Sequence, residues 1–259
     1  MVMRNLLLTI EYDGSGFHGW QEQPNVRTVQ GELQRALGIV LAEEVQVAGT
    51  SRTDAGVHAL GQCCSFETEN PIPVENLKKA VNNALSEGKA GAGAIPGDIK
   101  ILDCKEVPEG FHARFDCKGK TYGYLINTGE PDVFRRKYCY FVDGRLDVDA
   151  MNTAKEHIVG THDFACFQSA GGTPRETTVR TISDLTIENQ GDDYMIRVTG
   201  DGFLYNMVRI IVGTLVEVGL GKKTPDSVKD AIDGKDRSLA GHTAPAEGLY
   251  LEKIYFVMD

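Results

Sequence analysis

The sequence predicts an α+β protein that is built from two similar halves. Short runs in which apolar and polar residues alternate are typical of strands, and longer runs with apolar residues three or four positions apart are typical of helices. The two kinds of run follow one another in nearly the same order before and after Glu109. A chain of 259 residues, 41% of them hydrophobic, is long enough for two hydrophobic cores. We therefore expect one domain at residues 1–108 and a second at 109–259.

The first half reads as strand, helix, strand, strand, helix, strand. A helix is expected over 28–41, because Thr28 is a good N-cap and Leu33 and Leu37 lie one turn apart on an apolar face. A second helix is expected over 73–85 on the same pattern. The expected strands are 5–12, 44–48, 61–68 and 99–107.

The second half repeats this order with additions. Its expected strands are 120–127, 138–142, 181–188, 194–199 and 249–257, and its expected helices are 149–159, 204–218 and 225–232. The order βαββαβ is that of ferredoxin-like folds. We expect two such halves to form a mixed, mostly antiparallel sheet with a central active-site cleft. The glycine- and alanine-rich run 88–94 is expected to be a surface insertion.

The charges predict an acidic protein with a locally basic surface. The chain has 27 basic and 37 acidic residues, a net charge of −10, which argues against a uniformly basic nucleic-acid binder. Between residues 111 and 145, however, seven Lys or Arg outnumber four Asp or Glu, which gives +3 there and −13 elsewhere.

Nothing in the sequence predicts secretion, a membrane span or a metal site. The six cysteines have no spacing typical of zinc, so reduced thiols are expected. The longest apolar stretch, 207–220, contains Arg209 and Glu217 and is shorter than the ~20 residues of a membrane span. No leader with a cleavage site is recognisable at the N-terminus. A cytoplasmic location is expected.

A glycine pattern at residues 14–19 matches G-x-G-x-x-G and raises the possibility of dinucleotide binding. That motif requires a helix to begin at the third glycine, where its N-terminus holds a pyrophosphate. Here Pro24 follows Gly19 within five residues and the helical pattern begins only at Thr28. A glycine-rich turn is the better interpretation, with Trp20 and Gln21 either packed or facing a ligand.

The most informative segment is the polar loop Thr50-Ser51-Arg52-Thr53-Asp54-Ala55-Gly56-Val57-His58-Ala59, which lies between two expected strands. Asp54 stands beside Arg52 and close to Gly56, and loops of this kind often carry functional groups. The alternative is a turn aspartate that bonds to its own backbone.

Three other places have a structural and a functional interpretation. Of Tyr122 and Tyr124, one is expected to pack in the core and the other could stack on a base. Arg209, within an apolar helix, either extends to water or is buried against a carboxylate. The run Arg135-Arg136-Lys137 is most simply a solvated face.

Several short segments in a fixed order, spread over almost the whole chain, together resemble the tRNA pseudouridine synthase A family. They are Tyr12-Asp13-Gly14, Gly19-Trp20-Gln21, Thr28-Val29-Gln30, Arg52 to Ala59, Phe111-His112-Ala113-Arg114-Phe115, Tyr122-Gly123-Tyr124, His162-Asp163-Phe164, Met207-Val208-Arg209 with Gly213, and Ala244-Pro245 with Gly248-Leu249. The chain departs from the family pattern at Ser51, where glycine is usual, and at Tyr205-Asn206, where histidines are usual.

The resemblance implies an isomerase that converts uridine to pseudouridine at positions 38, 39 and 40 of tRNA, in the anticodon stem-loop. It implies a homodimer that needs no metal or cofactor. Asp54 would be the essential carboxylate, which either bonds to C1′ or assists loss of the 2′ proton. Arg209 would pair with Asp54, Arg52 would help to extrude the nucleotide, and Tyr122 would stack on the flipped base.

Binding tRNA requires cations in spite of the acidic total, because phosphate contacts dominate affinity. The candidate substrate-binding residues are Gln21, Arg27, Arg114, Lys118, Lys120, Tyr122, Arg135, Arg136 and Lys137. Two alternatives remain: a non-catalytic RNA-binding protein on the same scaffold, and a hydrolase that uses Asp54 and His58.

Overall fold

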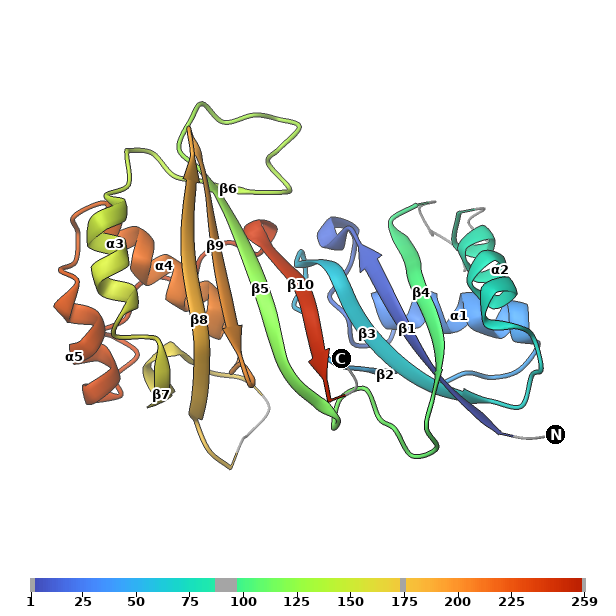
Figure 1. The fold of residues 1–259 in the computed structure, drawn as a ribbon. Coiled ribbons are helices and arrows are strands. Elements are labelled where there is room, and N and C mark those ends of the chain that lie inside the picture. The colour runs from blue at the N-terminus through green and yellow to red at the C-terminus, as the bar shows by residue number, and fades with distance from the viewer. Residues whose placement is uncertain (1–2, 87–96, 173–175, 258–259) are drawn as a thin grey trace. The chain divides into compact units, whose positions relative to one another are not determined.

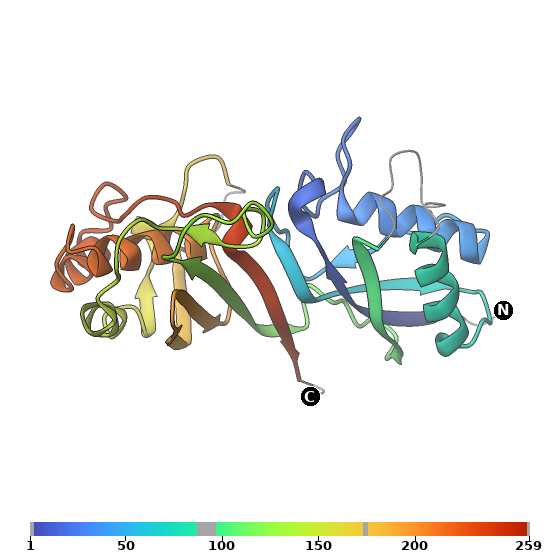
Figure 2. The same cartoon turned by 90° about the horizontal axis from the view of Figure 1, so that it is seen from above.

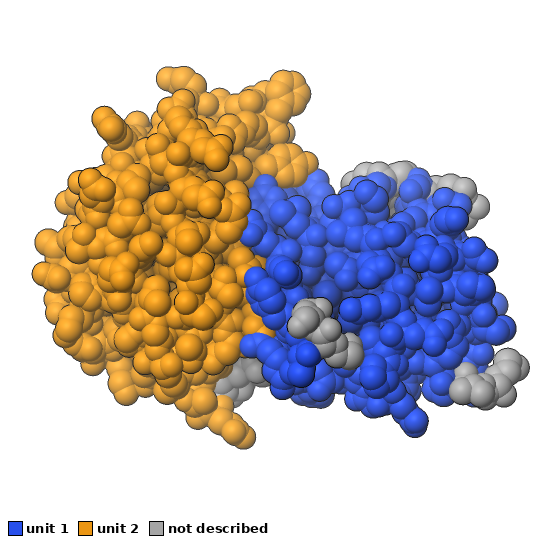
Figure 3. Space-filling view, in the orientation of Figure 1, with its two compact units in different colours: residues 1–118, 250–259 blue, residues 119–249 orange. Residues whose placement is uncertain are grey.

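Two compact units form the chain in the computed structural model, which describes residues 3–86, 97–172 and 176–257. Unit 1 comprises residues 1–118 and 250–259, and unit 2 comprises residues 119–249 (Figure 3). Unit 1 is therefore discontinuous in sequence, because its last strand comes from the C-terminal end of the chain. The expected division at 108/109 differs from these bounds by about ten residues and by the placement of that strand.

Unit 1 has the strand and helix order of a ferredoxin-like half, with one strand added. Its elements are β1 (Arg4–Tyr12), α1 (Val29–Leu41), β2 (Ala48–Gly49), β3 (His58–Thr68), α2 (Val74–Ser86), β4 (Ile99–Val107) and β10 (Leu249–Phe256), the last belonging to this unit from Tyr250 on (Figure 1). The strand order is β4-β1-β3, with β2 and β10 both paired to β3. Only the β3–β10 pair is parallel among the described pairings of this unit.

Helix α1 forms where the sequence predicts it, and for the predicted reason. The Thr28 side chain accepts a hydrogen bond from Gly31 N at 3.3 Å, and this caps the helix N-terminus. Leu33 and Leu37 are fully buried, as are Leu6 and Leu8 of β1, so the apolar face of the helix contributes to the core of unit 1.

The expected strand at 44–48 is wrong except at its end. Val45 and Val47 are buried and alternate with polar residues, which imitates a strand. The backbone of Val47, however, bonds to side chains of α1: its N–H donates to Gln34 Oε1 at 3.0 Å and its carbonyl accepts from Gln30 Nε2 at 3.0 Å. Since these groups already have partners, only Ala48–Gly49 pairs with β3.

Unit 2 is an antiparallel sheet with helices. Its elements are β5 (Cys117–Asn127, in this unit from Gly119 on), β6 (Tyr140–Phe141), α3 (Val148–Lys155), β7 (Gly160–Asp163), β8 (Val179–Gln190), β9 (Asp193–Gly200), α4 (Met207–Gly219) and α5 (Asp226–Gly234). The strand order is β5-β9-β8-β7, and the short β6 pairs in parallel with β5. Figures 1 and 2 show α3, α4 and α5 grouped together beside the sheet of this unit.

The fold class is confirmed: the protein is α+β with mixed, mostly antiparallel strand pairing. Most expected elements are present with shifts of a few residues. Strand β7 was not expected, because its sequence Gly-Thr-His-Asp has no apolar alternation. The expected insertion at 88–94 lies outside the described residues.

Candidate active site

Asp54 occupies the first position of a tight turn that leads into β3. The carbonyl of Asp54 accepts a hydrogen bond from Val57 N at 3.2 Å. Gly56, at the third position, has φ = +82°, a value that favours glycine. The Asp54 side chain is only half-buried, and Arg52 is exposed. The turn therefore presents the Asp54 carboxylate at the surface of unit 1, and the exposed Arg52 lies two positions before it.

The residue before Asp54 is fixed from two directions. The Tyr12 hydroxyl lies 2.7 Å from Thr53 Oγ1, and both side chains are buried. Trp20 N donates to the Thr53 carbonyl at 3.0 Å. Since a buried hydrogen bond is expensive to break, these contacts restrict the backbone at Asp54.

Ser51 is held by a buried glutamine. Gln62, on β3, is completely buried; its amide nitrogen donates to Ser51 O at 2.7 Å and its amide oxygen accepts from Ser51 N at 3.2 Å. The side chain thus bonds to both backbone polar groups of Ser51, as a neighbouring strand would. The loop is attached to β3 on its N-terminal side in this way.

Two glycines allow the segment after β1 to lie directly against the Asp54 loop. A Cβ on Gly14 would lie 1.9 Å from the Val57 carbonyl oxygen, and a Cβ on Gly19 would lie 2.7 Å from the Thr53 carbonyl oxygen. Gly19 also has φ = +87°. The glycine pattern at 14–19 therefore serves close packing, and the next α-helix along the chain begins only at Val29, as expected for a turn rather than a dinucleotide site.

His58 joins the same two segments from the interior. Its Nδ1 accepts a hydrogen bond from Gly14 N at 3.1 Å, and Asp13 Oδ1 lies 3.3 Å away. The ring stacks on Tyr250 of β10, with centroids 4.8 Å apart. The Gly14 N–H points at Nδ1, so this nitrogen links the ring to the segment after β1. A buried ring in this role is poorly placed to act as the base of a hydrolase.

The tyrosines of β5 have different environments. Tyr124 is fully buried, its hydroxyl donates to Pro245 O at 2.6 Å, and burial raises the pKa of Tyr124 well above its ordinary value. Tyr122 is half-buried and meets Phe203 edge to face, with ring centroids 5.2 Å apart. Tyr124 is therefore the core residue of the pair, and Tyr122 is the one with an accessible ring.

Arg209 lies in the first turn of α4 and is held by groups of unit 2. Its Nε donates to Ala244 O at 2.7 Å and its Nη1 donates to Asn206 Oδ1 at 2.9 Å. Asn206 has φ = +61° and also donates from Nδ2 to Ser169 Oγ at 3.1 Å. Asn206, one of the departures from the family pattern, thus connects Arg209 to a neighbouring loop.

Two of the predicted phosphate-binding cations, Arg27 and Arg135, form ion pairs within their own unit. Arg27 forms ion pairs with Glu32 and with Asp98, the latter at 2.7 Å, and lies 4.2 Å above the Phe17 ring. Burial lowers the pKa of Arg27, but the hydrogen bonds to both carboxylates and the negative charges of these carboxylates together raise it by more. Arg135 donates to Asp193 Oδ1 at 2.8 Å.

The other predicted substrate-binding residues differ in exposure. Gln21, Lys118, Arg136 and Lys137 are exposed, and Arg114 and Lys120 are half-buried. The structure places Gln21, Arg27, Arg52, Asp54, Arg114 and Lys118 in unit 1, and Lys120, Tyr122, Arg135, Arg136, Lys137 and Arg209 in unit 2.

Sequence reasoning missed the residues that fix the loop. Nothing in the sequence indicates that Tyr12 and Gln62 hold the loop, and His58 was expected only as a possible hydrolase residue, whereas the structure gives all three a supporting role. The available signal was Gln62, a polar residue that lies between Gly61 and Cys63 in an expected strand. A buried amide in such a place is expected to have specific partners.

Neither a metal site nor a helix suited to span a membrane is found among the residues that the structure describes. They contain no group of three or more His, Cys, Asp or Glu placed to hold a metal ion. Across the same ranges, no helix is both long and apolar enough to span a membrane.

Fold and site together define an α+β protein that presents one carboxylate from a rigidly supported turn. A family model described as tRNA pseudouridine synthase matches residues 8–116 and 154–257. The chain is 47% identical over 255 residues to tRNA pseudouridine synthase A 2 of Clostridium perfringens, covering 98% of this chain and 100% of that protein. It is 46% identical over 255 residues to tRNA pseudouridine synthase A of Acetivibrio thermocellus, with the same coverage. The chain therefore belongs to the tRNA pseudouridine synthase family.

Proposed function

We propose that this protein isomerises uridine in tRNA to pseudouridine. The observation that carries the proposal is Asp54, which stands in a turn supported on both sides within a segment that the family model covers. Relatives that match this chain over their whole length are named for this activity. The protein is thus an isomerase of the tRNA-modifying kind.

The reaction requires the uracil to leave C1′ of its ribose, turn, and rejoin through C5, which loses its proton. We propose Asp54 as the carboxylate that acts at the sugar, either as a nucleophile at C1′ or by assisting loss of the 2′ proton. Arg209 is proposed to keep Asp54 ionised, since a nearby cation lowers a carboxyl pKa. Tyr122, with its accessible ring, is proposed to stack on the extruded base, and Arg52 to help extrude it.

The proposed substrate site is the anticodon stem-loop, at positions 38, 39 and 40. Gln21, Arg27, Arg114, Lys118, Lys120, Arg135, Arg136 and Lys137 are proposed to contact it, Arg27 and Arg135 only if the RNA competes with their carboxylate partners. A homodimer acting in the cytoplasm completes the proposal.

Tritium release from tRNA transcripts labelled at C5 of uridine tests this function, because C5 loses its hydrogen only when the base rejoins there. We expect release by the parent protein and none by Asp54→Asn, which preserves the shape of the side chain and removes its charge. Asp103→Asn, at an exposed position on β4 of the same unit, is the matched control and should release tritium at the parent rate. If the parent binds tRNA and the label stays, a non-catalytic RNA-binding protein is the better description.

A further inference from the structure

The connection between β5 and β6 carries an exposed apolar tip. Figure 1 shows this connection as a long loop that extends beyond the strands of unit 2. Phe134 is 84% exposed and Val133 is 64% exposed, and both belong to residues 131–138, which we call the tip. These two neighbouring apolar side chains are open to contact with another molecule.

Hydrogen bonds within the tip fix its conformation. Asp132 Oδ1 accepts from Phe134 N at 2.7 Å, the Asp132 carbonyl accepts from Arg135 N at 3.1 Å, and the Arg135 carbonyl accepts from Tyr138 N at 2.8 Å. Arg136 Nη1 donates to the Val133 carbonyl. The Phe134 ring is therefore presented outward by successive turns.

The base of the tip is attached to the sheet of unit 2. Asp193, the first residue of β9, accepts from Arg135 Nη2 at 2.8 Å and from Asn127 Nδ2 at 2.6 Å. Asn127 is the last residue of β5, so one carboxylate ties the tip to two strands. An aromatic ring on a fixed support loses little conformational freedom when it binds a partner.

Cations accompany the ring. Arg136 and Lys137 are exposed within the tip, on a chain whose total charge is −10. A guanidinium has five N–H donors, so the bond from Arg136 to the Val133 carbonyl is compatible with a further contact to a phosphate. An exposed aromatic ring with neighbouring cations is the combination that binds single-stranded nucleic acid, by stacking on a base and pairing with the backbone.

We propose that the tip is an RNA-binding surface, in which Phe134 stacks on an unpaired base of the bound tRNA and Arg136 contacts its phosphate backbone. This deepens the proposed function and rests on it for the identity of the RNA. Stacking uses the face of any base, so the tip contributes affinity with little dependence on sequence.

Affinity measurements on a tRNA transcript test the proposal. Phe134→Ala should raise Kd by about 5- to 150-fold, the effect of losing one stacked base, and Phe134→Trp should retain the parent Kd. Under turnover, Phe134→Ala should raise KM with kcat unchanged at saturating tRNA. Leu239→Ala, which truncates an exposed apolar side chain in the same unit, is the matched control and should bind as the parent does.

Salt dependence separates the two contributions. Arg136→Ala should reduce the slope of log Kd against log salt concentration by about one, whereas Phe134→Ala should leave that slope unchanged. A parent-like Kd for Phe134→Ala overturns the proposal. So does a change in oligomeric state on sedimentation of Phe134→Ala, since the tip would then be a contact between copies of the chain.

The test of the tip by tRNA binding is independent of the test of the isomerase activity by tritium release. If the parent releases tritium and Phe134→Ala binds normally, the tip proposal fails alone. If the parent releases no tritium but Phe134→Ala weakens tRNA binding, the proposed activity fails and the RNA-binding tip stands.

Discussion

The Tyr12 and Thr53 hydroxyl groups lie 2.7 Å apart in the interior of unit 1 and join the end of β1 to the residue that precedes Asp54. These residues are separated by 41 positions in the sequence. The bond makes the position of the Asp54 turn depend on the first strand of the chain. Positioned groups lose much of their catalytic effect when displaced by about 1 Å.

Tyr12→Phe should lower kcat more than it changes KM, because it loosens the turn without removing a charged group. It should also lower the free energy of unfolding by about 1–2 kcal/mol, since the Thr53 hydroxyl loses a buried partner. Urea unfolding and tritium release measure the two effects. A parent-like kcat for Tyr12→Phe would contradict a positioning role for its hydroxyl.

Gly19→Ala should be more damaging than Gly110→Ala, although both residues have positive φ. Each substitution costs about 1 kcal/mol because of the left-handed backbone. Only at Gly19 does the new Cβ meet a backbone atom, the Thr53 oxygen at 2.7 Å; nothing lies within 4 Å at Gly110. We expect Gly19→Ala alone to reduce kcat, and equal activities of the two variants would show that the contact with Thr53 is unimportant.

Asn206→Gly should lower kcat several-fold with little change in stability. The substitution removes the acceptor for Arg209 Nη1 and the donor to Ser169 Oγ, but it relieves the positive φ of Asn206, which offsets the stability lost with these two bonds. Asn25→Gly is the control, because Asn25 has nearly the same φ, +62°, and is exposed. Thermal unfolding and steady-state kinetics should separate the two variants by activity alone. If Asn206→Gly is fully active, Ala244 is a sufficient support for Arg209.

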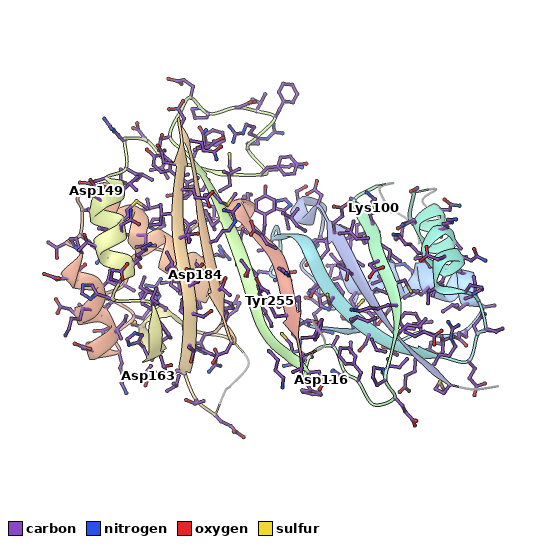
Figure 4. The ribbon with its side chains drawn as sticks, viewed as in Figure 1. Lys100, Asp116, Asp149, Asp163, Asp184 and Tyr255 are labelled. Atoms are coloured by element: carbon purple, nitrogen blue, oxygen red, sulfur yellow. The ribbon has the colours of Figure 1, made fainter. Side chains whose placement is uncertain are left out.

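Asp163→Asn should destabilise the protein at neutral pH and progressively less in acid. Lys235 Nζ lies 2.8 Å from Asp163, which Figure 4 labels, and this ion pair together with the Thr178 hydroxyl lowers the pKa of the carboxyl. A carboxyl whose folded pKa is depressed stabilises the protein above its ordinary pKa of ~3.9, and the contribution disappears as the pH falls through the folded pKa.

The expected loss for Asp163→Asn at pH 7 is at most about 1 kcal/mol, as for other partly exposed pairs. Urea unfolding of the parent and the variant at pH 7 and at pH values approaching 3 measures the difference. Asp233→Asn, whose carboxylate pairs with Lys229 at a fully exposed position, should have a smaller effect at every pH. A difference that stays constant with pH would assign the effect to lost hydrogen bonds rather than charge.

The sequence predicts the parts of the fold that depend on local pattern. Helix α1 was predictable because Thr28 and the spacing of Leu33 and Leu37 act within a few residues of one another. The segment around Val47 was mispredicted because its partners, Gln30 and Gln34, belong to the preceding helix, and no local pattern reveals that its backbone bonds to their side chains.

In the candidate site, too, local patterns were predictable and contacts between distant segments were not. Asp54 was found because the acid, the cation and the glycine of its turn lie together in sequence. The residues that support this turn were not predicted, because Tyr12 and Gln62 contact the loop from two different strands and are of types that are common in strands. The sequence alone could not decide which of Tyr122 and Tyr124 lies in the core. The partner of the Tyr124 hydroxyl is the Pro245 carbonyl, which is far away in the sequence.

Because β10 comes from the C-terminal end of the chain, unit 1 is completed late during synthesis on the ribosome. Residues 1–118 emerge first, but the strand that pairs in parallel with β3 and places Tyr250 against His58 follows only after all of residues 119–249. At translation rates of about 5–20 residues per second, that interval lasts on the order of ten seconds. The edge of β3 at His58 and Ala59 is therefore not yet paired with β10 while the second unit is being synthesised. A nascent chain stalled before Tyr250 should expose this edge to chaperones.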